Sequence, residues 1–236
     1  MGGQERTELL LGTEKLKKLS QSTVAIVGLG GVGAYAAEMV VRAGVGKVLL
    51  LDSDCVCESN KNRQLLALES TIGMKKTMVM DARLKDINPN LETILIDQYL
   101  DEKNIGEIFK GYSPDFLIDA IDTLSPKLAL IKYCVDNRIP HVTSMGAGAK
   151  TDATKIRITD LSKSYNCPLA YIIRKKLRKM GIEKGFPVVF SEELPDRGSI
   201  IPVEEQNKKS QVGTISYLPA VFGCACAQAA IDALLK

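Results

Sequence analysis

Short apolar runs alternate with longer amphipathic segments along the first 150 residues. Strands are expected at the apolar runs 24–27, 47–51, 91–96, 116–118 and 141–145. Helices are expected between them, over 34–43, 73–87 and 126–137. Strands that alternate with helices favour a mostly parallel sheet that is covered on both faces. The pattern therefore predicts an α/β fold, Rossmann-like and doubly wound.

The two ends of the chain follow a looser pattern. An amphipathic helix is expected over 8–19, strands over 155–158 and 188–191, a basic helix over 168–180, and a loop over 195–213. The second half of the uncharged run 210–231 is expected to form a buried terminal helix. We interpret the chain as a single domain, 1–236, with a core over 1–150 and a C-terminal elaboration over 151–236.

Composition narrows the chemistry. The 236 residues carry a net charge of +3, one histidine (His141) and no tryptophan, so a zinc hydrolase site with several histidines is not expected. A chain of this size without a signal peptide needs no disulfides, so its six cysteines are expected to be reduced thiols in a cytoplasmic protein. They form no C-x-x-C pair, so the usual zinc-knuckle spacing is missing. The charged N-terminus is unlike a signal peptide. Pro219 and polar residues interrupt the uncharged run, so no membrane span is expected.

A glycine-rich turn carries the first functional signal. The sequence GLGGVG contains Gly28, Gly30, Gly31 and Gly33, follows an apolar run and opens a helix. Glycines allow a phosphate to approach the backbone, and the helix start presents amides to the anion. Asp52 lies 19 residues after the last glycine, a spacing that suits a carboxylate bonded to ribose. The motif predicts an adenine nucleotide site, for which an NAD-dependent oxidoreductase is one interpretation.

Charged residues after later strands favour a different nucleotide. Arg63 and Lys76 follow the second strand, and Asp119 and Asp122 follow a later one. Carboxyl ends of strands converge on one crevice in a doubly wound sheet. Two cations with acidic residues there suit ATP and Mg²⁺ better than a nicotinamide. Transfer of AMP to a carboxylate fits a chain with one histidine, because that nucleophile is already ionised at neutral pH.

Five motifs together resemble the ubiquitin-activating-like adenylating enzymes, which include molybdopterin- and thiamine-biosynthetic members. The motifs are GLGGVG (28–33), DSD (52–54), NKNRQ (60–64), GMKK (73–76) and DAID (119–122). The resemblance implies that Asp52 holds the ribose, that Asn60, Arg63 and Lys76 contact the phosphates, and that Asp122 binds Mg²⁺. It also implies that Asp54 and Gln64 belong to the ATP site. Finally, it matches Arg6 to an arginine that enters the partner's site in a homodimer.

The identity of the activated carboxylate depends on the second half of the chain. Relatives that activate a ubiquitin-like or sulfur-carrier protein often carry a zinc module with two C-x-x-C pairs, which this sequence lacks. Cys167 precedes Pro168 in the elaboration, and we interpret it as a packed thiol. A carrier-protein substrate stays an alternative, and a nucleotide-binding regulatory module without turnover is another.

A basic run in the elaboration points to nucleic acid. Residues 174–184 contain six cations and one anion, a local charge of +5 that would attract a phosphate backbone. We expect the cations of its helical part to bind tRNA: Arg174, Lys175, Lys176, Arg178 and Lys179. A solvated helix face is the alternative interpretation.

Segments 146–179 and 186–193 resemble one branch of the superfamily, the tRNA threonylcarbamoyladenosine dehydratases. The resemblance implies activation of a threonyl carboxylate on a modified adenosine, followed by ring closure with loss of AMP. The group that accepts the proton in ring closure stays open between water, phosphate and a tyrosine such as Tyr165. Whether a sulfur-transfer protein is a further partner also stays open.

Overall fold

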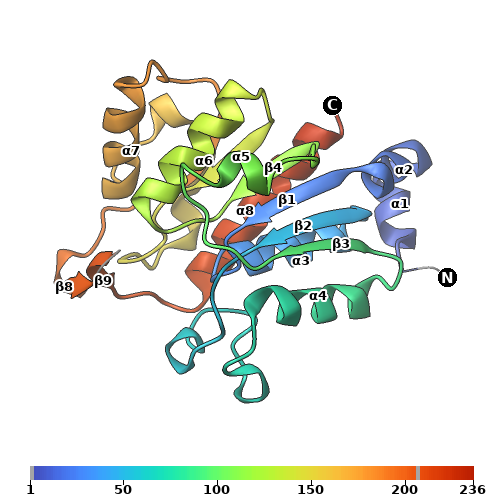
Figure 1. The fold of residues 1–236 in the computed structure, drawn as a ribbon, viewed down its shortest axis with the longest axis horizontal. Coiled ribbons are helices and arrows are strands. Elements are labelled where there is room, and N and C mark those ends of the chain that lie inside the picture. The colour runs from blue at the N-terminus through green and yellow to red at the C-terminus, as the bar shows by residue number, and fades with distance from the viewer. Residues whose placement is uncertain (1–2, 206–207) are drawn as a thin grey trace.

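Seven strands form the central sheet of the protein (Figure 1). The computed structural model describes residues 3–205 and 208–236. The strands follow the order β3-β2-β1-β4-β5-β7-β6, in which only β6 is antiparallel to its neighbour. They are β1 (Thr23–Val27), β2 (Lys47–Leu51), β3 (Glu92–Ile96), β4 (Phe116–Asp119), β5 (His141–Ser144), β6 (Ile156–Asp160) and β7 (Pro187–Ser191). The predicted doubly wound, mostly parallel fold is confirmed.

Eight α-helices connect and cover these strands in the described part of the chain. They are α1 (Glu5–Leu11), α2 (Thr13–Gln21), α3 (Gly33–Arg42), α4 (Lys76–Ile87), α5 (Ile105–Ile108), α6 (Leu124–Asp136), α7 (Pro168–Arg178) and α8 (Tyr217–Leu234). Apolar residues of α3, α4 and α8 pack on one face of the sheet, and those of α5, α6 and α7 pack on the other. Both faces are therefore buried, which explains the continuous apolar runs in the strands.

The strand order creates a crevice at the carboxyl ends of β1 and β4. The chain leaves β1 toward β2 and β3 on one side and returns to β4 on the other. The register pairs Val27, the last residue of β1, with Leu51 of β2 and Asp119 of β4. Ligands of open α/β sheets bind at such a reversal of strand order. The segments that follow these three strands therefore meet at one edge.

The N-terminal segment differs from the expected single helix over 8–19. Two helices, α1 and α2, meet at Gly12, whose φ of +83° breaks the helical path. That backbone conformation favours glycine. Both helices are short, and the amphipathic pattern of the sequence continues from one to the other. The pattern therefore did not predict the turn at Gly12.

Two other segments correct the sequence expectations. The helix predicted over 73–87 begins at Lys76, because residues 73–75 pair with 55–56 through the Cys55–Lys75 bridge and the bond from Val56 N to Met74 O. The loop predicted over 195–213 contains a hairpin, β8 (Ile200–Glu205) and β9 (Lys208–Val212). Strands β8 and β9 form a two-stranded sheet separate from the central one. They therefore need no alternation of buried and exposed residues, which is the pattern by which a strand is predicted from sequence.

The terminal helix α8 is a core element. It is long and apolar enough to span a membrane by composition, yet half of it is buried in the fold. Phe222, Cys226 and Ala230 are buried with α3 and the sheet. Gly223 allows the close crossing, since a Cβ there would lie 2.4 Å from the carbonyl oxygen of Val32. The predicted buried terminal helix is confirmed.

Candidate nucleotide and substrate site

The turn after β1 brings the start of α3 against the strand. A Cβ on Gly33 would lie 1.7 Å from the carbonyl oxygen of Gly28, and a Cβ on Gly28 would lie 2.9 Å from that of Ala120. A Cβ on Gly31 would lie 3.1 Å from Pro219. These three glycines are required by packing within the chain.

Gly30 has a different surrounding. A Cβ there would meet only Gln64 Nε2, at 3.8 Å, so open space lies above the backbone at this position. The first turn of α3 has no acidic residue, and its N-cap makes no side-chain hydrogen bond to the helix. Free helix N-terminal amides favour an anion. The turn therefore has room and donors for a phosphate at Gly30.

A buried lysine and two aspartates lie beside this turn. Lys76 Nζ, at the start of α4, is 2.8 Å from Asp54 Oδ2 and 3.9 Å from Asp52 Oδ1. Asp52 accepts hydrogen bonds from the amides of Leu29 (2.6 Å) and Asp54 (2.8 Å). Burial raises the pKa of the Asp52 carboxyl above its usual value, although Lys76 and the amide bonds act in the opposite direction. Asp52 is thereby fixed to the backbone of the glycine turn.

The loop after β2 supplies the next three predicted residues. Asn60 Oδ1 accepts a hydrogen bond from Cys57 N at 3.2 Å and so closes the turn that carries the loop. Arg63 is half-buried, and its guanidinium donates to Ser59 O at 3.0 Å. Gln64 Oε1 is buried and has no hydrogen-bond partner. An unpartnered acceptor beside Gly30 is consistent with a ligand that supplies the missing donor.

The two aspartates after β4 have separate environments. Asp119 is buried and pairs with Lys127 of α6, the Nζ–Oδ2 distance being 2.9 Å. Lys127 also donates to Ile121 O at 2.8 Å. Burial raises the pKa of Asp119 even though Lys127 acts in the opposite direction. Asp122 is exposed in the loop that precedes α6, so it is the solvent-facing aspartate of the DAID motif.

Sequence reasoning missed Lys127. It interrupts an otherwise apolar helix face, next to the buried Leu128 and Ile131, and a lysine at such a position signals a buried ion pair. His141 has structural contacts: its Nδ1 lies 2.9 Å from Ile139 O, and its ring centroid lies 4.7 Å from that of Phe186. Among the described residues no cluster of three or more His, Cys, Asp or Glu could hold a metal by itself.

Arg6 lies far from the glycine turn of its own chain. It is exposed on α1, and the neighbouring Gln4 donates a hydrogen bond to Arg42 O at the end of α3. The ten-residue α3 begins at the turn and spans about 15 Å. Figure 1 shows α1 and α2 at the opposite end of the strands from the loop after β2. The structure therefore does not bring Arg6 to the other predicted nucleotide residues within one chain.

Helix α7 exposes most of its predicted basic residues. Ala170, Ile173 and Leu177 form the buried face, and the exposed cations are Lys175, Lys176, Arg178 and Lys179. Arg174 differs, because its half-buried guanidinium donates to the carbonyl oxygen of Ser164 at 2.6 Å. Four of the five cations are thus exposed to solvent, and one of them, Arg178, also pairs with Glu183 at 3.5 Å.

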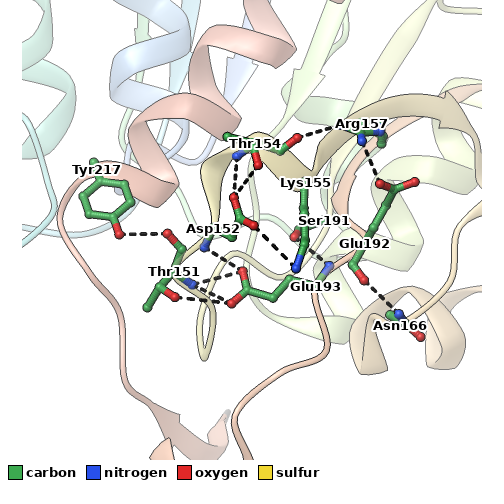
Figure 2. A network of polar contacts seen from close by, with 10 residues as sticks. All are labelled: Thr151, Asp152, Thr154, Lys155, Arg157, Asn166, Ser191, Glu192, Glu193 and Tyr217. Carbon is green, nitrogen blue, oxygen red and sulfur yellow. Dashed lines mark hydrogen bonds and ion pairs between the residues drawn. The ribbon is translucent and has the colours of Figure 1, made fainter.

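A polar network follows the carboxyl end of β7 (Figure 2). Glu193 accepts hydrogen bonds from the amides of Thr151 and Asp152, and Tyr217 OH donates to Thr151 O at 2.8 Å. Next to it, Glu192 pairs with Arg157 at 2.8 Å. Glu192 also accepts a hydrogen bond from Tyr165 OH. That bond to Glu192 is the largest cause of a raised pKa of Tyr165. These contacts join residues 151–157 to the strand end. Glu192 and Glu193 lie in the segment 186–193 that carries the resemblance, but neither was predicted to be a site residue.

The buried pair below Asp122 leads to a stability prediction. Lys127→Met leaves the Asp119 carboxylate buried without its cation, so we expect a loss of about 3–5 kcal/mol in the free energy of unfolding. The loss should shrink as the pH falls, because the folded-state pKa of Asp119 is already raised and a protonated Asp119 needs no partner. Urea unfolding across pH measures it. A second substitution, Asp119→Asn, should recover part of the loss, and no recovery would contradict the pairing.

Comparisons with known proteins agree with this geometry. The model of the ThiF family matches residues 4–236. The tRNA threonylcarbamoyladenosine dehydratase of Bacillus subtilis (strain 168) is 48% identical over 190 residues, which are 80% of this chain and 74% of that protein. The crystal structure of the Escherichia coli tRNA N6-threonylcarbamoyladenosine dehydratase in complex with ATP has a TM-score of 0.89 at 34% identity, covering 97% of this chain and 92% of that one.

A relative with another substrate is less similar. The adenylyltransferase and sulfurtransferase of Saccharomyces cerevisiae (strain YJM789) is 29% identical over 150 residues, which are 64% of this chain and 34% of that protein. The similarity to the dehydratases thus extends further along the chain and includes the elaboration after residue 150. The match over residues 4–236 shows that the chain belongs to the ThiF family.

Proposed function

We propose that this protein is an ATP-dependent tRNA threonylcarbamoyladenosine dehydratase. It activates the threonyl carboxylate of the modified nucleoside with ATP and closes a ring with release of AMP. The observation that carries the proposal is the convergence of Gly30, Asp52, Arg63 and Lys76 at one sheet edge, in a chain 48% identical to a dehydratase of that name. An NAD-dependent oxidoreductase would not need two cations at this edge.

Each converging residue has a role in ATP binding that its contacts support. Asp52 is held by two amides and so presents a fixed carboxylate to the ribose hydroxyls. The open backbone at Gly30 leaves room for a phosphate, and the amides of α3 can donate hydrogen bonds to it. Arg63 and Lys76 supply the positive charge that the phosphates require, with Asn60 shaping their loop.

Asp122 fits a Mg²⁺ ion that ATP brings with it. Mg²⁺ prefers oxygen ligands and is usually held by one or two carboxylates together with substrate phosphates. Asp122 is exposed where β4 meets α6, above the buried Asp119–Lys127 pair. When bound, the ion would neutralise charge on the phosphates. The protein's own part is to fix the Asp122 backbone through the pair below it.

The reaction needs positioning more than proton transfer in its first step. The threonyl carboxylate is ionised at neutral pH and attacks the α-phosphorus directly. Arg63 and Lys76 stabilise the negative charge that develops on the departing pyrophosphate. The carbamoyl nitrogen or oxygen of the same side arm then attacks the activated carbonyl carbon, AMP leaves, and the carbamoyl proton passes to water, phosphate or a tyrosine such as Tyr165. This two-step sequence explains why one structural histidine suffices.

The tRNA is proposed to lie across α7. Its four exposed cations match the phosphate backbone in charge, and α7 begins two residues after Asn166, whose side chain donates to Glu192 O. Binding through backbone charge needs no large aromatic platform. We keep the expectation of a cytoplasmic protein, because ATP and tRNA are the proposed substrates.

A homodimer is proposed to complete the ATP site. Arg6 lies about the length of α3 away from the glycine turn of its own chain. The apolar Leu9 and Leu10 on the same helix are 82% and 83% exposed. Such exposure favours a covering partner, and a two-fold dimer would place each α1 on the other chain.

The proposed activity is tested by incubating the protein with ATP, Mg²⁺ and tRNA that carries threonylcarbamoyladenosine, followed by mass spectrometry of the nucleosides. We expect the modified nucleoside to lose the mass of one water. Arg63→Ala should slow this conversion by about 2–4 kcal/mol in transition-state free energy. Lys61→Met, in the same loop but paired with Glu58 and Glu69, is the control. An unchanged rate for Arg63→Ala would contradict its role.

Mixing variants tests the contribution of Arg6 in trans. Arg6→Ala and Asp122→Ala should each be inactive as homodimers. After the two are mixed and allowed to exchange subunits, heterodimers contain one intact site, so about a quarter of the wild-type activity should return. A mixture that stays inactive, although mass measurement shows heterodimers, would exclude the shared site.

Charge removal on α7 tests the tRNA surface. Replacing Lys175, Lys176 and Lys179 by Gln should weaken tRNA binding and lower the slope of log affinity against log salt by about one for each lysine that contacts a phosphate. The matched control replaces three exposed lysines on other elements, Lys85, Lys103 and Lys110. Equal salt slopes for the two variants would show that α7 is only a solvated face.

A further inference from the structure

Three lysines of the described residues are buried, and they differ in what compensates their charge. Lys76 and Lys127 each pair with an aspartate, as described above. Lys150 is as buried as Lys76, both being 4% exposed, yet its Nζ donates to a neutral acceptor, the carbonyl oxygen of Ser191, at 3.0 Å. It forms no ion pair with the carboxylates that the structure describes. A buried ammonium without an anion is costly, so such a group signals a function.

The groups around Lys150 do not supply the missing charge. Glu193 is nearby, but its two carboxylate oxygens accept hydrogen bonds from the amides of Thr151 and Asp152 (Figure 2). The Cys167 thiol is also near, and it is buried. Burial lowers the pKa of Lys150, while Cys167 and Glu193 act in the opposite direction. A ligand carboxylate would therefore gain a strong partner at Nζ.

One short segment, 213–219, contacts both the loop that carries Lys150 and the proposed nucleotide residues. The amide of Ala149 donates to Gly213 O at 2.8 Å. One residue further, Thr214 O accepts a hydrogen bond from the Asn62 side chain at 2.9 Å, and Asn62 precedes Arg63. At the other end of this segment, Pro219 packs against Gly31. The loop that carries Lys150 thus shares an edge with the phosphate-binding loop.

We propose that Lys150 binds the threonyl carboxylate of the tRNA substrate and orients it toward the α-phosphate of ATP. The inference rests on the proposed function, because it names the group that selects the modified nucleoside. The ammonium offers donors that Ser191 does not use. A nucleoside without the carboxylate leaves the cation unpaired, so recognition of the modification follows from the same contact.

The test compares two tRNAs, with and without threonylcarbamoyladenosine, binding to the whole protein in the presence of a non-hydrolysable ATP analogue. Wild-type protein should prefer the modified tRNA. Lys150→Gln keeps a donor for Ser191 O but removes the charge, and it should weaken binding of the modified tRNA by about 10- to 100-fold. Its affinity for unmodified tRNA should not change. Lys150→Met should behave in the same way.

Lys155→Met is the matched control. This lysine lies on the same segment, but it is half-exposed and pairs with Asp152 at 3.4 Å, so its loss should leave the preference intact. A wild-type preference in a folded Lys150→Gln variant would overturn the assignment. Conversion of the same modified tRNA by the wild-type protein is measured separately from binding. Absence of dehydration in that measurement would overturn the proposed function instead, so the two failures can be distinguished.

Discussion

The close approach of α3 to the end of β1 is the constraint on which the site depends. Gly33 stands where any side chain would collide with the backbone of Gly28, and Gly28 in turn lies against Ala120 after β4. Because these contacts fix the helix start between two strand ends, the amides of α3, the Asp52 carboxylate and the loop after β4 converge. A side chain at Gly33 would separate them, and the residues proposed to contact ATP would lose their common geometry.

Charge compensation organises the rest of this edge. Three lysines are buried in the part of the chain whose side chains the structure describes, and two of them pair with aspartates of the same chain. Lys76 fixes Asp52 and Asp54 near the turn, and Lys127 stabilises the loop that carries Asp122. A buried pair of this kind contributes little net stability against an apolar alternative, but it holds its partners in one arrangement. In this protein the arrangement is the placement of two loops around the proposed phosphate site.

Much of this architecture could be predicted from the sequence. Strand β2 is as predicted, and other core strands agree to within about a residue, because apolar runs between glycine turns are local signals. The motif residues Gly30, Asp52, Arg63 and Lys76 meet as expected, since strand order brings their loops to one edge. The inward turn of Asp119 was not predictable in this way. It depends on Lys127, which a helix of another layer supplies, and sequence spacing does not show such a contact.

The second half of the site could be predicted only in outline. The basic face of α7 follows from composition, whereas the hairpin β8–β9 and the segment 213–219 carry few periodic apolar residues and little local signal. Yet segment 213–219 contacts both Ala149 and Asn62, so the loop that binds phosphate and the loop with Lys150 share one support. Adenylation requires that ATP and a carboxylate meet in line, and a common support fixes their distance without a moving domain. The proposed function therefore requires the elaboration after residue 150 for the placement of the two reactants as well as for a tRNA surface.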